Sequence, residues 1–354
     1  MDAKLYISDY ALRANKFINL FFETKIKEVK NLGNGKAVVY ATDMLDRYQK
    51  FSMGGKKLRG SWIQLGYEIA GGNKKEVLQA STSIEIIHSF LLMHDDIQDK
   101  DDVRRSGPTI HKQFETKGKR LSFQKDNLHY GISMGINMGD LGSNMGFEVL
   151  LTSKHDPQAK IKAARYLSRL LQRVAFGQGM DVTFEHQGKV TQSNVLDIHL
   201  HKTSIYTVSG PLKIGAYLGE AKLEVITAME KFGEPVGIAF QLRDDELGLF
   251  SNEETLGKPI GSDIKEGKNT LLRTKAIENS NQVDRKFLTW AYGNRQISKG
   301  DVKRVQEITL RTGALEYSQK LSRKLVDQGR KYIPYIAKDN QFQQTLSSMA
   351  DLMI

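Results

Sequence analysis

Cysteine is absent from the 354-residue sequence, and proline is scarce, with six residues. Without cysteine the chain can form neither disulfide bonds nor thiolate metal sites, so any metal ion must be held by carboxylates or histidines. Proline interrupts helices, and its scarcity favours long ones. No run of about 18 apolar residues is present that could span a bilayer. The first residues, MDAKLYISDY, lack the pattern of a secretory signal. We therefore expect a soluble, cytoplasmic protein.

The sequence has little negative charge relative to its positive charge. Lysine and arginine number 52 against 41 aspartates and glutamates, which gives a formal net charge of +11. Such a surplus suits nucleic acid, an anionic lipid surface or a phosphorylated small molecule, and charge alone puts nucleic acid first. A nucleic-acid-binding protein would also need basic runs interleaved with aromatic residues, or a known reading motif, and neither is present. We therefore expect no nucleic acid partner.

Apolar residues recur at helical spacing along most of the chain, and strand-like stretches are short. The segments with this period are 3–32, 37–51, 74–99, 127–153, 158–178, 191–218, 221–250 and 298–332. Because no alternation of strands and helices separates them, we expect an all-α fold in a single domain over residues 1–354. Residues 1–35 would contain an N-terminal helix and residues 312–354 a helical tail. We expect Pro211 and Pro235 to kink their helices.

Glycine lines one face of the predicted helix in 127–153. Such a face allows another helix to approach closely, either inside the fold or across a dimer. The glycines recur at spacing four in two sets: Gly131, Gly135 and Gly139, then Gly142 and Gly146.

Two acidic clusters each follow an apolar helical segment. In the first, HDDIQDKDD (94–102), Asp95 and Asp99 are four residues apart and share a helix face. Like charges at that spacing need a compensating cation, and oxygen ligands favour a hard ion such as Mg²⁺. An isolated cluster would equally fit a solvated acidic loop. The second cluster, Asp244-Asp245-Glu246, makes that reading less attractive, because two such helix ends predict a polyanionic substrate bridged between them by Mg²⁺.

Basic residues accompany both clusters, although each alone would equally fit a solvated surface charge. With these cations the sequence resembles the trans-polyprenyl diphosphate synthase family, in the right order from about residue 50 to 275. The motifs that carry the resemblance are GGKKLR (54–59), HDDIQDKDDVRRSGPT (94–109), GQGMD (177–181), HKTSIY (201–206), FQLRDDELG (240–248) and GKPIGSDIKEGKNT (257–270).

The resemblance implies the isoprenoid synthase type I fold, a bundle of long antiparallel helices around a central apolar cavity. It also implies a homodimer, and a Mg²⁺-dependent prenyltransferase that joins isopentenyl diphosphate head to tail to an allylic diphosphate. The allylic substrate loses pyrophosphate, the double bond of isopentenyl diphosphate attacks the cation, and loss of a proton gives an all-trans prenyl diphosphate.

The resemblance also implies a role for individual residues. Direct Mg²⁺ ligands would be Asp95, Asp99 and Asp244, with Asp96 and Asp245 acting through water or from beside the ion. Substrate diphosphates would be bound by Arg104, Lys202, Lys258 and Lys268. A metal-free site for isopentenyl diphosphate would consist of Lys56, Arg59, His88 and Arg105. The cationic intermediate would be lined by Thr203, Tyr206, Phe240 and Gln241. Catalytic roles would fall to Lys202, Thr203, Tyr206 and Gln241. His88 by itself would equally fit a hydrogen-bonded core residue.

Product length in this family depends on the bulk below the first aspartate motif. Phe90 precedes Asp95 by five residues, about 7.5 Å along a helix axis, and its neighbour Leu91 is not aromatic. This arrangement resembles the geranylgeranyl diphosphate synthases and predicts a twenty-carbon product, whereas two adjacent aromatic residues would have suggested fifteen carbons. A farnesyl or longer product remains an alternative, as does a Phe90 that only packs the core.

The sequence departs from the family pattern in two places. Gly248 occupies the third acidic position of the second motif, and Ser106-Gly107 reverses the usual order of small residues. A weakly catalytic subunit of a heteromeric synthase is therefore an alternative. A terpene cyclase would not need Lys56, Arg59 and Arg105. In the tail, five cations form either a solvated helix face or a contact with an anionic membrane: Lys320, Arg323, Lys324, Arg330 and Lys331.

Overall fold

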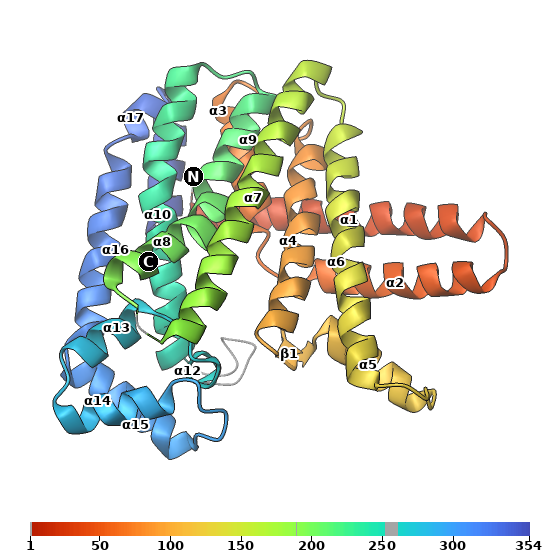
Figure 1. Ribbon diagram of the computed structural model, residues 1–354. Coiled ribbons are helices and arrows are strands. Elements are labelled where there is room, and N and C mark those ends of the chain that lie inside the picture. Colours follow the sequence, from red (N-terminus) through yellow and green to blue (C-terminus); the bar gives the residue numbers. More distant parts are fainter. Residues whose placement is uncertain (1, 189, 252–260) are drawn as a thin grey trace.

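Long helices run side by side and form most of the molecule (Figure 1). The computed structural model describes residues 2–188, 190–251 and 261–354. The bundle consists of α3 (Leu58–Ile69), α4 (Leu78–Gln98), α6 (Asn127–Leu151), α7 (Pro157–Gln187), α9 (Gly210–Leu218), α10 (Leu223–Phe250) and α16 (Ala314–Arg330). The predicted all-α fold is confirmed, and the described residues contain only one short pair of strands, β1 (Val103–Arg104) and β2 (Gly107–Pro108).

The first two helices form a hairpin that projects sideways from the bundle (Figure 1). α1 (Ala3–Lys30) and α2 (Lys36–Met53) bury Ile18, Phe22 and Tyr48 in an apolar cluster that they share with α4 and α6. The start of α1 lies beside the C-terminal helices, because the backbone N–H of Ala3 donates to Ser348 Oγ at 3.0 Å.

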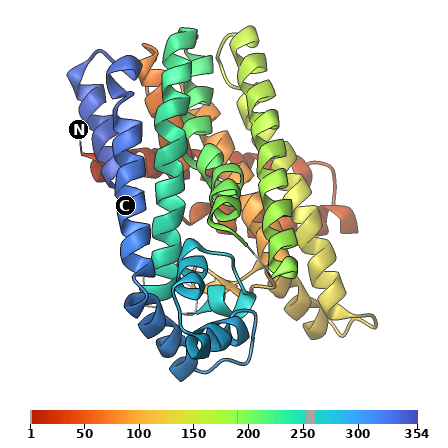
Figure 2. The ribbon, with the colours of Figure 1, turned by 60° about the vertical axis from the view of Figure 1, so that its left-hand side comes forward.

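Shorter helices cover the end of the bundle at which α4 and α10 end (Figure 2). Those at this end are α12 (Ser262–Glu266), α13 (Leu271–Glu278), α14 (Gln282–Ala291) and α15 (Lys299–Arg311). The remaining helices are α5 (Ile110–Arg120), α8 (Gln192–Ile198), the π-helix η1 (His199–Ser209), α17 (Ile333–Ile336) and α18 (Asn340–Asp351).

Two segments predicted from apolar periodicity are interrupted in the structure. Segment 298–332 divides into α15 and α16 at Gly313, which has a φ of 73°, a left-handed conformation that glycine adopts without strain. Segment 191–218 contains α8, η1 and α9 in succession, and Pro211 lies in the first turn of α9. Pro235 lies inside α10.

The glycine face of α6 packs against helices of the same chain. A side chain at Gly139 would meet the ring of His94, and one at Gly146 would meet Ile87, both on α4. Gly142 faces Tyr48 of α2 in the same way, and Gly131 faces α5. Of the two alternatives for this face, close packing inside the fold is confirmed.

Candidate active site

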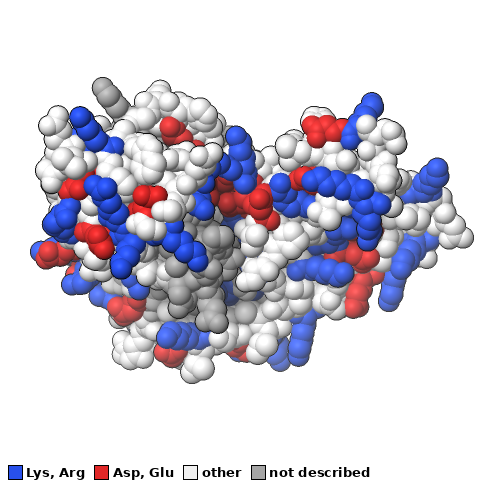
Figure 3. All heavy atoms as spheres, turned by 90° about the horizontal axis from the view of Figure 1, so that it is seen from below, with Lys and Arg blue, Asp and Glu red and all other residues white. Residues whose placement is uncertain are grey.

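The two aspartate motifs lie at the same end of the bundle, on either side of η1. Lys202 Nζ lies 3.4 Å from Asp95 Oδ1 of the first motif, and His199 Nε2 lies 3.3 Å from Asp245 Oδ2 of the second. Figure 3 looks onto this end, where acidic atoms gather near the middle of the face with Lys and Arg on both sides. The predicted convergence of the two motifs is therefore present, and η1 connects them.

A small hairpin holds Arg104 against the first motif. β1 pairs with β2, and the turn residues Arg105 and Ser106 have φ values of 53° and 60°. Arg104 Nε donates to Asp96, whose side chain is fully buried, and Nη2 donates to Asp101 Oδ2 at 3.3 Å. The reversed Ser106-Gly107 order thus puts Ser106, not the glycine, in a left-handed position.

Two lysines from other segments of the chain neutralise the first motif. Lys202 donates to Asp181 Oδ2 of α7 at 2.7 Å while it lies beside Asp95. Lys268, which precedes α13, donates to Asp99 Oδ1 at 2.6 Å and lies 3.0 Å from Glu185 Oε1. These contacts bring four segments of the chain together around Asp95 and Asp99.

Burial gives the carboxyl groups of the site unusual pKa values. It raises the pKa of Asp96 to about 7 even though Arg104 opposes this change. It also raises the pKa of Asp244 to about 7, and the adjacent Asp245 adds to the effect. Burial would raise the pKa of Asp95 too, but Lys202, Lys268 and Arg104 hold it below the usual range. Asp96 and Asp244 would therefore ionise fully at neutral pH only with another cation beside them.

The second motif is held mainly by its own helix and by η1. Gln241 Nε2 donates to Asp245 Oδ1 at 2.8 Å, and Glu246 is buried and lies 3.2 Å from Arg243 Nη1. At Gly248 a side chain would meet the carboxylate of Asp263 from α12. The carboxylate missing from the motif at position 248 thus has a counterpart in Asp263.

The π-helical turns of η1 broaden the backbone where it carries site residues. Such widened turns are frequent at functional sites because they redirect side chains. η1 also touches α7 closely, since a side chain at Gly177 would meet the backbone of His201 and Lys202. Gly177 therefore lets Lys202 reach Asp95.

A second group of cations, Arg59 and Arg105, lies beside the aspartates. Arg59 Nη2 donates to Thr207 Oγ1 at 2.9 Å, and its guanidinium lies 4.9 Å from the centre of the Tyr206 ring. Arg105 donates to the carbonyl of Phe51 at 2.7 Å and packs on Gly54. Within the described part of the chain, neither arginine forms an ion pair. Two arginines that form no ion pair in the described ranges are suited to bind an anion without a metal.

His88 lies among these cations as a neutral ring. Arg59 can only donate, so Nε2 of His88 accepts from Arg59 Nη1 at 3.1 Å and the ring proton lies on Nδ1. Nδ1 is buried and has no partner among the described residues. Burial and the charges of Arg59, Arg105 and Arg104 lower the pKa of His88 well below its usual value. The ring therefore offers an N–H donor to an anion.

The remaining predicted residues differ in their exposure and in the clusters that they border. Lys56 is exposed, whereas Lys57 is buried and donates to the carbonyl of Ser52. Tyr206 is buried with its hydroxyl 3.4 Å from the carbonyl of Ile84, and Thr203 is partly buried. Phe90 and Leu91 border one apolar cluster and Phe240 another. Lys258 lies outside the described residues.

Several residues of the site were missed by the sequence reasoning. Asp181 and Glu185 hold the two lysines, His199 holds Asp245, and Arg295 Nη2 donates to the backbone carbonyl of Asp99 at 3.1 Å. Asp181 ends the GQGMD motif, so its motif could have drawn attention to it. Nothing in the sequence around Arg295 indicates its contact with α4.

The carboxylates of the site suit Mg²⁺ in their chemistry. Among the described residues no group of three carboxylate or imidazole side chains lies close enough to hold a metal ion alone. Mg²⁺ at phosphate sites needs only one or two carboxylates, because water and substrate phosphates complete its shell. Asp96 Oδ2 is buried and has no hydrogen-bond partner in the described part of the chain, which also fits a cation or its bound water.

Comparisons with known proteins agree with the geometry. Residues 42–309 match the family model for polyprenyl synthetase. The chain is 37% identical over 231 residues to a geranylgeranyl diphosphate synthase of Methanosarcina mazei, covering 65% of this chain and 66% of that protein. It is 32% identical over 289 residues to a geranylgeranyl diphosphate synthase of Sulfolobus acidocaldarius, covering 80% and 82%.

Solved structures resemble the whole chain. A geranylgeranyl pyrophosphate synthase from Corynebacterium glutamicum, complexed with isoprenyl diphosphate and magnesium, has a TM-score of 0.91 at 26% identity, covering 100% of this chain and 99% of that one. A geranylgeranyl pyrophosphate synthetase from Geoglobus acetivorans has a TM-score of 0.78 at 27% identity, covering 98% and 99%.

Proposed function

Because the chain belongs to the polyprenyl synthetase family and is therefore a prenyltransferase, we propose that it makes geranylgeranyl diphosphate. It would add isopentenyl diphosphate head to tail to an allylic diphosphate. The observation that carries this proposal is the pair of adjoining sites: carboxylates paired with cations on one side, and on the other cations that form no ion pair with a described residue. Two diphosphates, one bound with metal and one without, match this pair.

Each diphosphate would be held by a different set of side chains. Lys202 and Arg104, already beside Asp95, would turn to the allylic diphosphate. Arg59, Arg105 and His88 would bind isopentenyl diphosphate, with the Nδ1–H of His88 donating to a phosphate oxygen. Lys56 is exposed near the same loop and would add a further charge.

The chain also provides conditions for a cationic intermediate. Tyr206 is 2% exposed and lies under Arg59, next to the apolar cluster that contains Ile84 and Ile87. An apolar wall excludes water that would otherwise capture a carbocation. Asp95, Asp99 and Asp244 would hold Mg²⁺, which, when bound with the diphosphate, supplies charge stabilisation for the departing pyrophosphate. No side-chain base is required if the released pyrophosphate accepts the proton.

A twenty-carbon product is supported by the relatives and by the two residues that precede Asp95 by four and five positions on α4. Leu91 is four residues before Asp95 and shares its helix face, while Phe90 borders the same apolar cluster. Replacing Phe90 with alanine should lengthen the product, and chromatography of the products would measure it. An unchanged length distribution would contradict a role for Phe90 in setting length.

The proposed reaction is tested by Mg²⁺-dependent incorporation of labelled isopentenyl diphosphate with dimethylallyl, geranyl or farnesyl diphosphate as primer. Asp95→Asn should abolish incorporation, whereas Asp43→Asn, in an ion pair of the α2 region, should leave it unchanged. No incorporation by the wild type with any primer would refute the proposal. Activity that appears only with a second synthase present would favour the weakly catalytic subunit.

We also propose that the protein is a homodimer in the cytoplasm. The glycine face of α6 is used inside the fold, so α6 would contribute a different face, on which Ile136 is 47% exposed. Sedimentation equilibrium of the wild type and Ile136→Glu would test this. A wild type that stays monomeric at micromolar concentration would contradict it.

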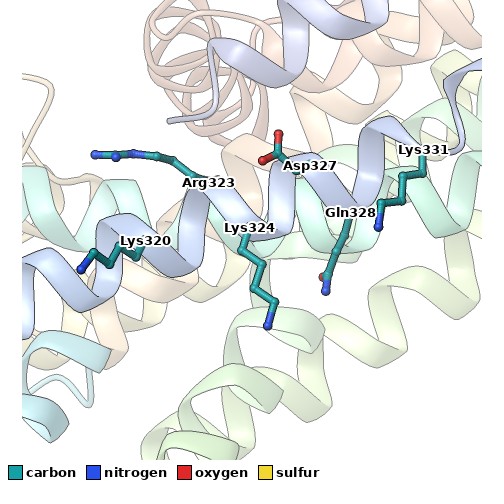
Figure 4. Close-up of a pocket in the computed structure, with 6 residues that line it drawn as sticks. All are labelled: Lys320, Arg323, Lys324, Asp327, Gln328 and Lys331. Atoms are coloured by element: carbon teal, nitrogen blue, oxygen red, sulfur yellow. The ribbon is translucent and has the colours of Figure 1, made fainter.

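Peripheral membrane contact would involve the outer face of α16. A hollow of about 450 Å³ lies among Lys320, Arg323, Lys324, Asp327, Gln328 and Lys331 (Figure 4). Lys320 pairs with Glu316, but Arg323, Lys324 and Lys331 have no ion pair within the described ranges. Such a basic face suits anionic lipid. No helix in the described part of the chain is long and apolar enough to cross a bilayer.

Vesicle sedimentation would test the basic face. Wild type should bind vesicles with anionic phospholipid, and changing Arg323, Lys324 and Lys331 to glutamate should abolish binding. The same charge change on α7, at Lys162, Arg165 and Arg169, should have a smaller effect. Equal losses in both variants would refute a specific face.

A further inference from the structure

Phe90 does not lie directly below Asp95, although it precedes the first aspartate motif. Five residues of an α-helix turn the side chain by about 140° from that of Asp95. Phe90 instead stacks edge to face on His94, with ring centroids 5.7 Å apart and an interplanar angle of 76°. Leu91 is the residue that shares the face of Asp95. The side of the pocket that Phe90 forms is therefore the side next to α6.

His94 is fixed in the space between α4 and α6. Its Nε2 lies 3.2 Å from the carbonyl of Ile136 on α6, and because a carbonyl only accepts, Nε2–H donates this bond. The ring also occupies the space that a side chain at Gly139 would need. A hydrogen bond and a close helix contact thus hold the ring from one side, and Phe90 touches it from the other.

We propose that His94 is a positioning residue for product length, which it controls by bracing Phe90 against the growing chain. The proposal rests on the proposed function and adds to it a residue outside the motif's carboxylates. Phe90 borders the apolar cluster with Ile84, Ile87 and Tyr206, into which a prenyl chain would extend from Asp95. A phenyl ring backed by a fixed imidazole cannot rotate away from that chain.

Removal of the imidazole would leave a void directly behind Phe90. A side chain next to such a void moves into it where an alternative rotamer is accessible. Because the His94 ring is the neighbour of the Phe90 ring on that side, its removal makes such a rotamer accessible to Phe90. In His94→Ala the Phe90 ring should move toward α6 and open the pocket. Longer products should follow, although Phe90 itself is unchanged.

The test compares four proteins: wild type, His94→Ala, Phe90→Ala and the double variant, each assayed with labelled isopentenyl diphosphate and a fixed primer. His94→Ala should shift the main product to a longer chain. In the Phe90→Ala background the same change should have no further effect on length, because His94 acts through Phe90. Product length is measured by chromatography and folding by thermal melting, which separates a change in length from a loss of stability.

Met93→Ala is the matched control. Met93 precedes His94, is 1% exposed and packs in a different apolar cluster, with Ile18, Phe22 and Tyr48. Its truncation also leaves a void near the aspartates but not behind Phe90, so product length should not change. His94→Gln, which keeps a donor for Ile136 but lacks the ring, should lengthen the product as His94→Ala does.

The outcomes separate the inference from the proposed function. If the wild type forms no prenyl product, the proposed function fails. If it forms one whose length is unchanged in His94→Ala and His94→Gln, the bracing role is refuted. A lengthening that Met93→Ala reproduces, or that adds to the effect of Phe90→Ala, would refute it as well, because general loosening of α4 would then suffice.

Discussion

His88 illustrates how single residues of this site are set by their neighbours. Its ring accepts from Arg59, has no partner for Nδ1–H among the residues that the structure describes, and stays neutral among cations. A lone histidine on an apolar helix would equally fit a core position. Its contact with Arg59, which has no carboxylate partner in the described ranges, favours a role in binding an anion.

The neutral state of His88 predicts a pH dependence of stability. Below about pH 6.5 the unfolded state takes up a proton on this histidine, whereas the folded state, with its lowered pKa, does not. The free energy of unfolding should fall by about 1.4 kcal/mol per pH unit below that pH until the folded pKa is reached. Urea unfolding of wild type and His88→Gln between pH 7.5 and 5 measures this. Parallel curves for the two proteins would contradict the prediction.

Asp181 is expected to influence the affinity of the site for Mg²⁺. It pairs with Lys202 at 2.7 Å and lies 3.8 Å from Lys268. In Asp181→Asn, Lys268 would keep its partner Glu185, but Lys202 would depend on Asp95 and so compete with a metal ion there. Affinity for Mg²⁺ with inorganic diphosphate, measured by calorimetry, should fall about 10- to 100-fold. Asp43→Asn, far from the site on α2, should keep the wild-type affinity, and an unchanged Asp181→Asn would argue against this role.

Among the elements, η1 has the greatest influence on the site. It lies between α7 and α10 and carries both His199, which contacts the second motif, and Lys202, which contacts the first. Its position depends on the close approach of α7 at Gly177. A shift of this one helix would therefore change both motifs together.

Two neighbouring glycines of α7 provide a paired test. Gly177→Ala would press a methyl group on the backbone of Lys202, which should cost about 1–3 kcal/mol and reduce activity further by displacing Lys202. The methyl group of Gly179→Ala would meet no atom of the described residues within 4 Å and should stabilise the helix by up to about 1 kcal/mol. Chemical denaturation measures the stability of both variants, and the turnover rate measures their activity. If the two variants behave alike, close packing at Gly177 is not important.

At the scale of the whole molecule, the site joins parts that are far apart in the chain. Lys268 and Arg295, beside α13 and α15, reach Asp99 at the end of α4. The side chains that meet at the first motif therefore come from the middle and the C-terminal part of the bundle. Cations that replace or join these contacts should therefore change the stability of the whole protein.

This arrangement predicts that Mg²⁺ and inorganic diphosphate stabilise the protein jointly. Burial raises the pKa values of Asp96 and Asp244, so Mg²⁺ that binds alone must displace protons and lysines from the carboxyl groups. Diphosphate that binds alone is repelled by the carboxylates. Together, at about 100 times their dissociation constant, they should add about 2.7 kcal/mol. Thermal melting should show a shift larger than the sum of the separate shifts. Asp244→Asn should lose this excess, and a purely additive shift in the wild type would count against a shared site.

Much of the fold could be predicted because helical periodicity is a local property. Segment 127–153 became α6 within two residues of its expected end, and 221–250 became α10. The break at Gly313 and the π-helical turns of η1 were not predicted, since both leave the apolar period nearly intact. Motif residues such as Asp95 and Arg59 were found, whereas Arg295 and Glu185 were not, because their roles depend on distance in space alone.

The sequence by itself determined the helices, the order of the motifs and the kind of side chains at each helix end. Only the tertiary structure decided which side chain each cation contacts. Lys202 contacts Asp181 as well as Asp95, and Arg59 contacts His88 rather than a carboxylate. The reason is physical. Helix formation depends on residues three and four positions apart, but ion pairs depend on how helices distant in the chain pack, and on close approaches such as that at Gly177.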